Sequence, residues 1–141
     1  IAGHSAGAYE IAMLTLKPKT FQTDLKIKNF IGIEGIYDLI TFANDFPEWE
    51  SSLYVTFTSN KTNWIERSPQ TTMREESDIY ANNWLIVHSK QDSYVNLRQA
   101  TDFFSLLKTV DKISVELFDS LQGDHFTAVG QVDVNVSAET P

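Results

Sequence analysis

The chain has 141 residues, no cysteine, a hydrophobic content of 42% and a formal net charge of −8 at pH 7. The absence of cysteine excludes disulfides, thiolate catalysis and cysteine-ligated zinc, and the length suits one domain core. The acidic charge without a Lys/Arg cluster argues against a nucleic-acid partner, and no apolar run approaches the roughly 18 residues that span a bilayer.

The chain opens on a G-x-S-x-G pattern, Gly3-His4-Ser5-Ala6-Gly7. This pattern is typical of the nucleophile elbow of α/β-hydrolases, a strained strand-to-helix turn that exposes a serine hydroxyl. Only Ile1-Ala2 precede it, so we expect the N-terminal strands of such a fold to be missing. Residues 8–16 are apolar enough to predict a buried helix, which Pro18 ends.

Short apolar strands and helices then alternate, which is typical of a parallel sheet with helices on its faces. Residues 30–36 and 83–88 predict core strands, and residues 114–118 predict the last strand. Between residues 96 and 110, apolar side chains at three- and four-residue steps predict an amphipathic helix. We therefore expect an α/β fold over residues 1–129, the C-terminal portion of an α/β-hydrolase with a parallel sheet flanked by helices.

Two segments fit this alternation less well. Residues 44–78 are rich in aromatic, Ser, Thr and Asn residues. They suit either a helical excursion that caps the site or a surface connection packed by its own aromatic side chains. No firm structure is predicted for residues 130–141, and the two sequons at Asn60 and Asn135 are weak signals for glycosylation.

Three residues follow the order nucleophile, acid, histidine: Ser5, Asp92 and His125. Each comes just after a predicted strand, so their side chains can converge at one edge of a parallel sheet. A serine hydroxyl is a weak nucleophile until a base accepts its proton. We predict His125 as that base and Asp92 as the acid that orients it, in the chain order that α/β-hydrolases use.

Other residues compete for the roles of acid and base. Asp38 also ends a strand and is the alternative acid, whereas Asp119 and Asp124 lie too near the catalytic histidine in sequence to be its usual partner. His4 lies inside the elbow. His88 lies within a strand, where a buried, hydrogen-bonded histidine is the ordinary case.

The predicted oxyanion hole is half present. The backbone N–H of Ala6 should donate one hydrogen bond, but the second donor usually comes from an upstream HGG-type loop, which this sequence lacks. No metal or cofactor is expected, because the three histidines are far apart and no H-x-x-x-H or phosphate-binding glycine motif occurs.

Three further segments extend the pattern: Glu34-Gly35-Ile36-Tyr37-Asp38-Leu39, then Val87-His88-Ser89 with Asp92, and Asp124-His125-Phe126. Together with the elbow they resemble the kynurenine formamidases, or arylformamidases, particularly fungal ones. The resemblance implies a cytoplasmic serine hydrolase that converts N-formyl-L-kynurenine to L-kynurenine and formate in tryptophan breakdown. It implies Ser5 as nucleophile, Asp92 as acid and His125 as base.

Two alternatives stay open beside a formamidase. One is a short-chain carboxylesterase with the same triad, and the other is a non-catalytic fragment without a complete oxyanion hole. The expected partner is a small-molecule substrate, with no nucleic acid and no membrane, and the sequence leaves a homodimer open.

Overall fold

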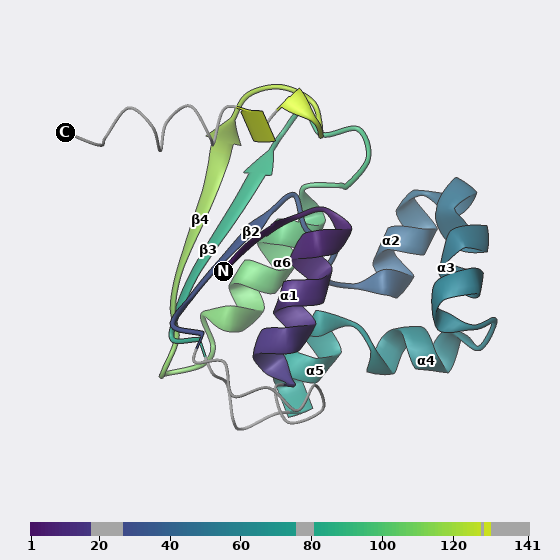
Figure 1. The fold of residues 1–141 in the computed structure, drawn as a ribbon, viewed down its shortest axis with the longest axis horizontal. Coiled ribbons are helices and arrows are strands. Elements are labelled where there is room, and N and C mark those ends of the chain that lie inside the picture. Colours follow the sequence, from purple (N-terminus) through teal and green to yellow (C-terminus); the bar gives the residue numbers. More distant parts are fainter. Residues whose placement is uncertain (18–26, 76–80, 128, 131–141) are drawn as a thin grey trace.

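The structure, a computed structural model, describes residues 1–17, 27–75, 81–127 and 129–130. Four parallel strands form one sheet in the order β1-β2-β3-β4 (Figure 1). Because all strands run the same way, the loops that follow them open at one edge of the sheet, where α/β proteins place their ligands. The strands are β1 (Ala2–His4), β2 (Asn29–Ile33), β3 (Asn83–Ser89) and β4 (Ser114–Leu121).

Three helices contribute to the core on one face of this sheet: α1 (Ala6–Leu16), α5 (Pro69–Glu75) and α6 (Arg98–Leu107). Right-handed crossovers place helices on one face when the strand order follows the chain. On α6, the apolar side chains at three- and four-residue spacing point into this core. Its fully buried side chains include Leu16, Phe30, Tyr37, Ile86, Phe103 and Leu107.

The predicted strands are present, and some of their ends differ. β2 ends at Ile33 instead of the predicted Ile36, because Glu34 has a φ of 50°, which interrupts the extended backbone. β4 continues to Leu121 instead of ending at Phe118, since it stays paired with β3 across a register shift.

The segment predicted as an excursion or a surface connection is largely helical. After α2 (Leu39–Asp45) come a 3₁₀ turn, η1 (Pro47–Trp49), and two short helices, α3 (Glu50–Phe57) and α4 (Lys61–Glu66). Figure 1 shows α2, α3 and α4 set to one side of the helices that cover the sheet. They enclose a second core made of Leu39, Phe42, Ala43, Leu53, Trp64 and Val95.

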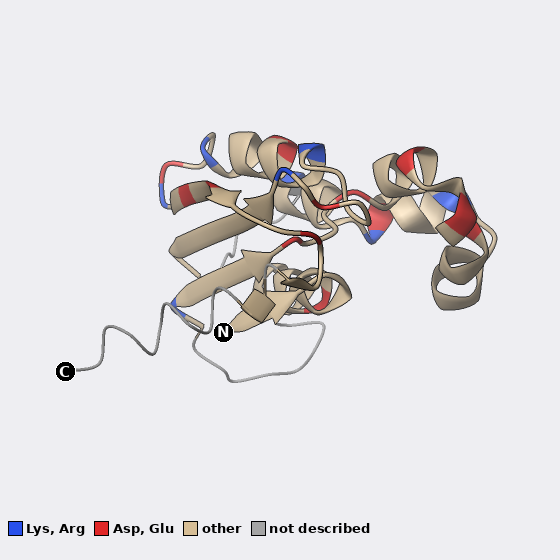
Figure 2. Cartoon of the chain, turned by 90° about the horizontal axis from the view of Figure 1, so that it is seen from above, with Lys and Arg blue, Asp and Glu red and all other residues tan. Residues whose placement is uncertain are grey.

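Some predictions fall outside the described residues: the helix end at Pro18, the sequon at Asn135, residues 76–78 of the excursion and residues 131–141 of the tail. Within the described ranges, no helix has the length and apolar character needed to cross a bilayer. Lys and Arg residues are scattered over helices and loops in the described part of the chain (Figure 2).

The Tyr37 side chain offers a test of core packing. It is fully buried and its ring stacks on Phe103, with 4.3 Å between centroids. Among the described residues its hydroxyl has no hydrogen-bond partner, and burial raises its pKa far above the usual range, so the phenol is neutral. The Y37F variant removes this polar atom and keeps the ring. We expect its free energy of unfolding in urea to be unchanged or higher by about 1 kcal/mol.

Tyr9 provides the matched control for this change. Its hydroxyl donates to the backbone oxygen of Arg67 at 3.1 Å, so Y9F removes a hydrogen bond that is made. Y9F should therefore be less stable than the parent protein, whereas a clear loss of stability in Y37F would show that the Tyr37 hydroxyl has a partner.

Candidate active site

Ser5 lies at the turn between β1 and α1. Its φ is 54° and its ψ is −124°, a strained conformation for a residue with a side chain. The turn is fixed on both sides: Ser5 N donates to Ile33 O at 2.9 Å, and Ser5 O accepts from Ala8 N at 3.0 Å. This is the geometry that the G-x-S-x-G pattern predicts, a sharp turn between a strand and a helix.

The two elbow glycines have different roles. A Cβ added at Gly3 would lie 2.6 Å from the carbonyl oxygen of Gly7, whereas a Cβ at Gly7 would meet nothing within 4 Å. Gly3 therefore permits the close approach of β1 to α1. We expect G3A to lower the free energy of unfolding by about 1–3 kcal/mol through overpacking, measured by urea denaturation.

G7A is the matched control, since it adds the same methyl group at a position where a Cβ meets no atom within 4 Å. It should change stability by less than about 0.5 kcal/mol. Equal losses in the two variants would contradict the assignment of close packing to Gly3.

His125 and Asp92 are directly paired. His125 Nδ1 and Asp92 Oδ2 are 2.8 Å apart, and the other carboxylate oxygen accepts from the N–H groups of Tyr94 (2.8 Å) and Val95 (2.9 Å). Burial by itself raises the pKa of Asp92, but the hydrogen bonds from His125 and these N–H groups outweigh it and leave the pKa below its usual value. Asp92 is thus a carboxylate that holds His125 with Nδ1 as donor and leaves Nε2 available as base.

Ser5 and His125 line the same cavity, which has a volume of about 360 Å³. Among the described contacts the Ser5 hydroxyl makes no hydrogen bond to His125, and in many hydrolases this contact tightens only when substrate binds. Ala6 also lines the cavity, and its N–H belongs to the first turn of α1, where backbone donors have no intrahelical acceptor. The structure thus brings Asp92 and His125 together and places Ser5 and Ala6 around the same space.

The other acidic candidates have other contacts. The Asp38 carboxylate accepts two backbone N–H bonds, each 3.0 Å long, from the first turn of α2, so it caps that helix. Asp119 forms an ion pair with Lys90 at 2.9 Å. Asp124 accepts hydrogen bonds within its own loop.

The other two histidines differ from each other. His88 is fully buried in β3, and its Nε2 lies 2.9 Å from Val95 O; burial lowers its pKa, so it is a neutral structural donor. His4 is half-buried beside the elbow, and its Nε2 lies 2.9 Å from the backbone oxygen of His125. Since a carbonyl only accepts, His4 Nε2 carries the proton. His4 therefore links the elbow to the loop that carries the predicted base.

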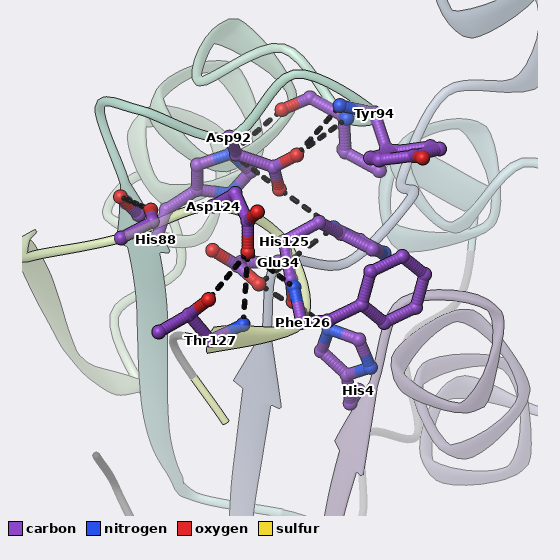
Figure 3. A network of polar contacts seen from close by, with 12 residues as sticks. His4, Glu34, His88, Asp92, Tyr94, Asp124, His125, Phe126 and Thr127 are labelled. Carbon is purple, nitrogen blue, oxygen red and sulfur yellow. Dashed lines mark hydrogen bonds and ion pairs between the residues drawn. The ribbon is translucent and has the colours of Figure 1, made fainter. Parts of the chain in front are cut away.

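Glu34 belongs to this network and was not predicted. It is fully buried, and its Oε2 lies 3.2 Å from His4 Nε2 and 3.6 Å from His125 Nδ1 (Figure 3). Its position in the sequence, an acid between the apolar Ile33 and Gly35 at the end of a core strand, is the signal that could have indicated it.

His4, Glu34 and His125 also bring three metal-ligating atoms within 4.8 Å of one another. The two ring nitrogens that lie near Glu34 Oε2 are already hydrogen-bonded, His4 Nε2 to a backbone oxygen and His125 Nδ1 to Asp92. In this arrangement the three side chains form a hydrogen-bond network around the predicted base.

Comparison with known proteins identifies the family. The sequence matches the prolyl oligopeptidase family over residues 1–140. The chain belongs to this family. A search of curated proteins gave no significant match.

Solved structures share the fold of this prolyl oligopeptidase family member. The Pyrococcus horikoshii acylaminoacyl peptidase is 21% identical, with a TM-score of 0.69 over 92% of this chain and 20% of that chain. A puromycin-hydrolysing peptidase of Mycobacterium tuberculosis is 23% identical, with a TM-score of 0.66 over 96% and 20%. The S-formylglutathione hydrolase of Agrobacterium tumefaciens is 18% identical, with a TM-score of 0.65 over 97% and 46%.

The chain therefore spans about a fifth of the length of these peptidases. The likenesses confirm the predicted α/β class, a parallel sheet with helices that corresponds to part of an α/β-hydrolase fold. The family match supports a hydrolase. The matching family is that of prolyl oligopeptidase, and none of these three structures is a kynurenine formamidase. The comparisons therefore do not identify N-formyl-L-kynurenine as the substrate.

Proposed function

We propose that the protein is a serine hydrolase that cleaves an acyl bond through a covalent acyl-enzyme. The observation that carries the proposal is the Asp92–His125 pair, 2.8 Å apart with both side chains buried, beside the cavity that Ser5 also lines. A histidine oriented by a hydrogen-bonded carboxylate and a serine at an elbow together form the arrangement that activates a weak nucleophile.

The reaction would proceed in two halves. His125 Nε2 accepts the Ser5 proton as the oxygen attacks the carbonyl carbon, and the resulting oxyanion accepts a hydrogen bond from Ala6 N–H. The imidazolium then donates its proton to the leaving group, which departs. Water next attacks the acyl-enzyme with His125 again as base, which releases the acid and restores Ser5.

The side chains that line the cavity are suited to an aromatic substrate. Six aromatic side chains line it, and among its described lining residues Glu10 is the one Asp, Glu, Lys or Arg, so a substrate with an apolar ring and an ammonium group would find partners there. N-formyl-L-kynurenine has both features and a small formyl group. The finer proposal is therefore hydrolysis of this arylformamide to L-kynurenine and formate. The aromatic lining residues are Tyr9, Phe42, Trp49, Phe57, Tyr94 and Phe126.

Cleavage of a short peptide or aminoacyl amide is the second candidate. The family match over residues 1–140 and the likeness to two peptidases favour it. An amino-terminal ammonium group and an apolar side chain would suit the same cavity, so the pocket chemistry alone is compatible with both substrates. A short-chain ester is the third substrate class, and it needs the triad but not Glu10.

One panel of substrates separates these candidates. With purified protein, kcat/KM would be measured for N-formyl-L-kynurenine, an aminoacyl p-nitroanilide and p-nitrophenyl acetate. Highest efficiency on the formamide with formate release supports a formamidase, and highest efficiency on the anilide supports a peptidase. Equal or greater ester turnover supports a carboxylesterase. Failure of folded protein to label at Ser5 with a fluorophosphonate would contradict a serine hydrolase of any kind.

A further inference from the structure

The proposed mechanism makes no use of Glu34, although this carboxyl group faces His4 and His125. Its Oε2 lies 3.2 Å from His4 Nε2 and 3.6 Å from His125 Nδ1, while Oε1 has no hydrogen-bond partner among the described residues. The side chain is fully buried. A carboxyl group that is buried and incompletely paired costs stability, so its place here requires an explanation.

The backbone at Glu34 is strained as well. Its φ is 50°, in the left-handed region, and its N–H is held by Val87 O at 2.8 Å. A glycine would adopt this conformation without strain. The turn after β2 thus carries an acidic side chain at a position that favours glycine, and the side chain points into the network around His125 (Figure 3).

Charged and titratable groups reach Glu34 from three other segments: His4 on β1, Asp92 after β3, and Asp124 and His125 after β4. Burial first, and the Asp92 charge second, raise the pKa of Glu34 to about 7, while the charge of His125 opposes this rise. Burial and the charge of His125 lower the pKa of His4, so His4 is the neutral member. Glu34 can therefore change its charge at neutral pH, beside a carboxylate that stays ionised.

We propose that Glu34 is a second acidic positioning residue for His125, which adds a negative charge beside Nδ1 and, through His4, holds the His125 loop against the elbow. This inference rests on the proposed function. When His125 accepts the Ser5 proton, the imidazolium then lies between two carboxyl groups, Asp92 at 2.8 Å and Glu34 at 3.6 Å. Ionised Glu34 stabilises that cation and makes His125 a stronger base.

The isosteric E34Q variant tests the charge while it keeps the shape and an oxygen that can accept from His4. We expect kcat at pH 8 to fall about tenfold, and the acidic limb of kcat/KM to move about one pH unit lower, since His125 loses a stabilising charge.

The stability of E34Q at pH 8 should rise, whereas its activity falls. A folded-state pKa raised above the ordinary 4.5 of Glu34 means that the parent protein loses stability as pH rises from 4.5 through about 7. E34Q lacks this loss and should have the higher Tm at pH 8.

Opposite changes in activity and stability distinguish positioning from a purely structural role, which would lower both. Glu116 lies exposed on β4, so E116Q removes the same charge far from the site and should leave the pH profile unchanged. An E34Q profile that overlies the parent profile, or a fall in Tm together with activity, would overturn the inference.

A titration of His125 by NMR makes the test independent of turnover. In E34Q the His125 titration midpoint should fall by about one unit, and an unchanged midpoint would refute the role of Glu34 even if no substrate is cleaved. Conversely, a parent protein that fails to label with fluorophosphonate would refute the proposed hydrolase while the His125 shift could still be measured, so the two failures are distinguishable.

Discussion

The S5A variant is expected to lose roughly 10⁶-fold in kcat on the best substrate of the panel, because the covalent step then lacks its attacking oxygen. The left-handed φ of 54° at this turn is unfavourable by a similar free energy for alanine and for serine, so the fold should be retained. The measurement is p-nitrophenyl acetate or formamide turnover at pH 8, with fluorophosphonate labelling as a second readout and Tm as a check on folding.

Ser105 on α6 supplies the matched control for this change. It is exposed, and its hydroxyl donates to the backbone oxygen of Thr101 within the same helix. S105A should retain activity within about twofold, since surface changes remote from the site have small effects. Activity of S5A within tenfold of the parent would show that the elbow serine is not the nucleophile.

The fold could be predicted from the sequence because its signals are local. The elbow pattern at residues 3–7 fixes a strand, a turn and a helix in one step, and the apolar spacing of Ala100, Phe103 and Leu107 defines α6 without reference to the rest of the chain. The parallel sheet follows from the alternation of strands with helices. The order Ser5, Asp92, His125 could be read in the same way, since each residue follows its own strand.

The Glu34 network could not be predicted, because it depends on how separate segments converge. Three strands bring His4, Glu34 and Asp92 to one edge, and the left-handed φ at Glu34 decides that its side chain turns inward. Periodicity assigns Glu34 to a strand that in fact ends one residue earlier. Similarly, Gln99 is buried and its Oε1 accepts from Tyr37 N and Asp38 N at 2.8 Å, a contact between residues about 60 positions apart.

The assignment of the acid is the second prediction with a large effect. D92N should lower kcat about 10⁴-fold, because the amide NH₂ would face His125 Nδ1 and favour the tautomer that has its proton on Nε2, where the base must accept one. Asparagine can still accept through its oxygen from the N–H groups of Tyr94 and Val95, so the loop should keep its shape. The measurement is kcat and kcat/KM across pH 6–9, with Tm as the folding check.

D38N is the matched control, because it makes the same change at the other acid that follows a strand. Asparagine caps helices about as well as aspartate, and the Asp38 carboxylate only caps α2, so D38N should keep kcat within about threefold. Glu34, 3.6 Å from the same nitrogen, should account for part of the activity that remains in D92N, and the D92N/E34Q double variant should then be weaker than D92N alone. If D38N lost activity and D92N kept it, the 2.8 Å contact between Asp92 and His125 would have to be structural, and the acid of the triad would have to reach His125 from β2.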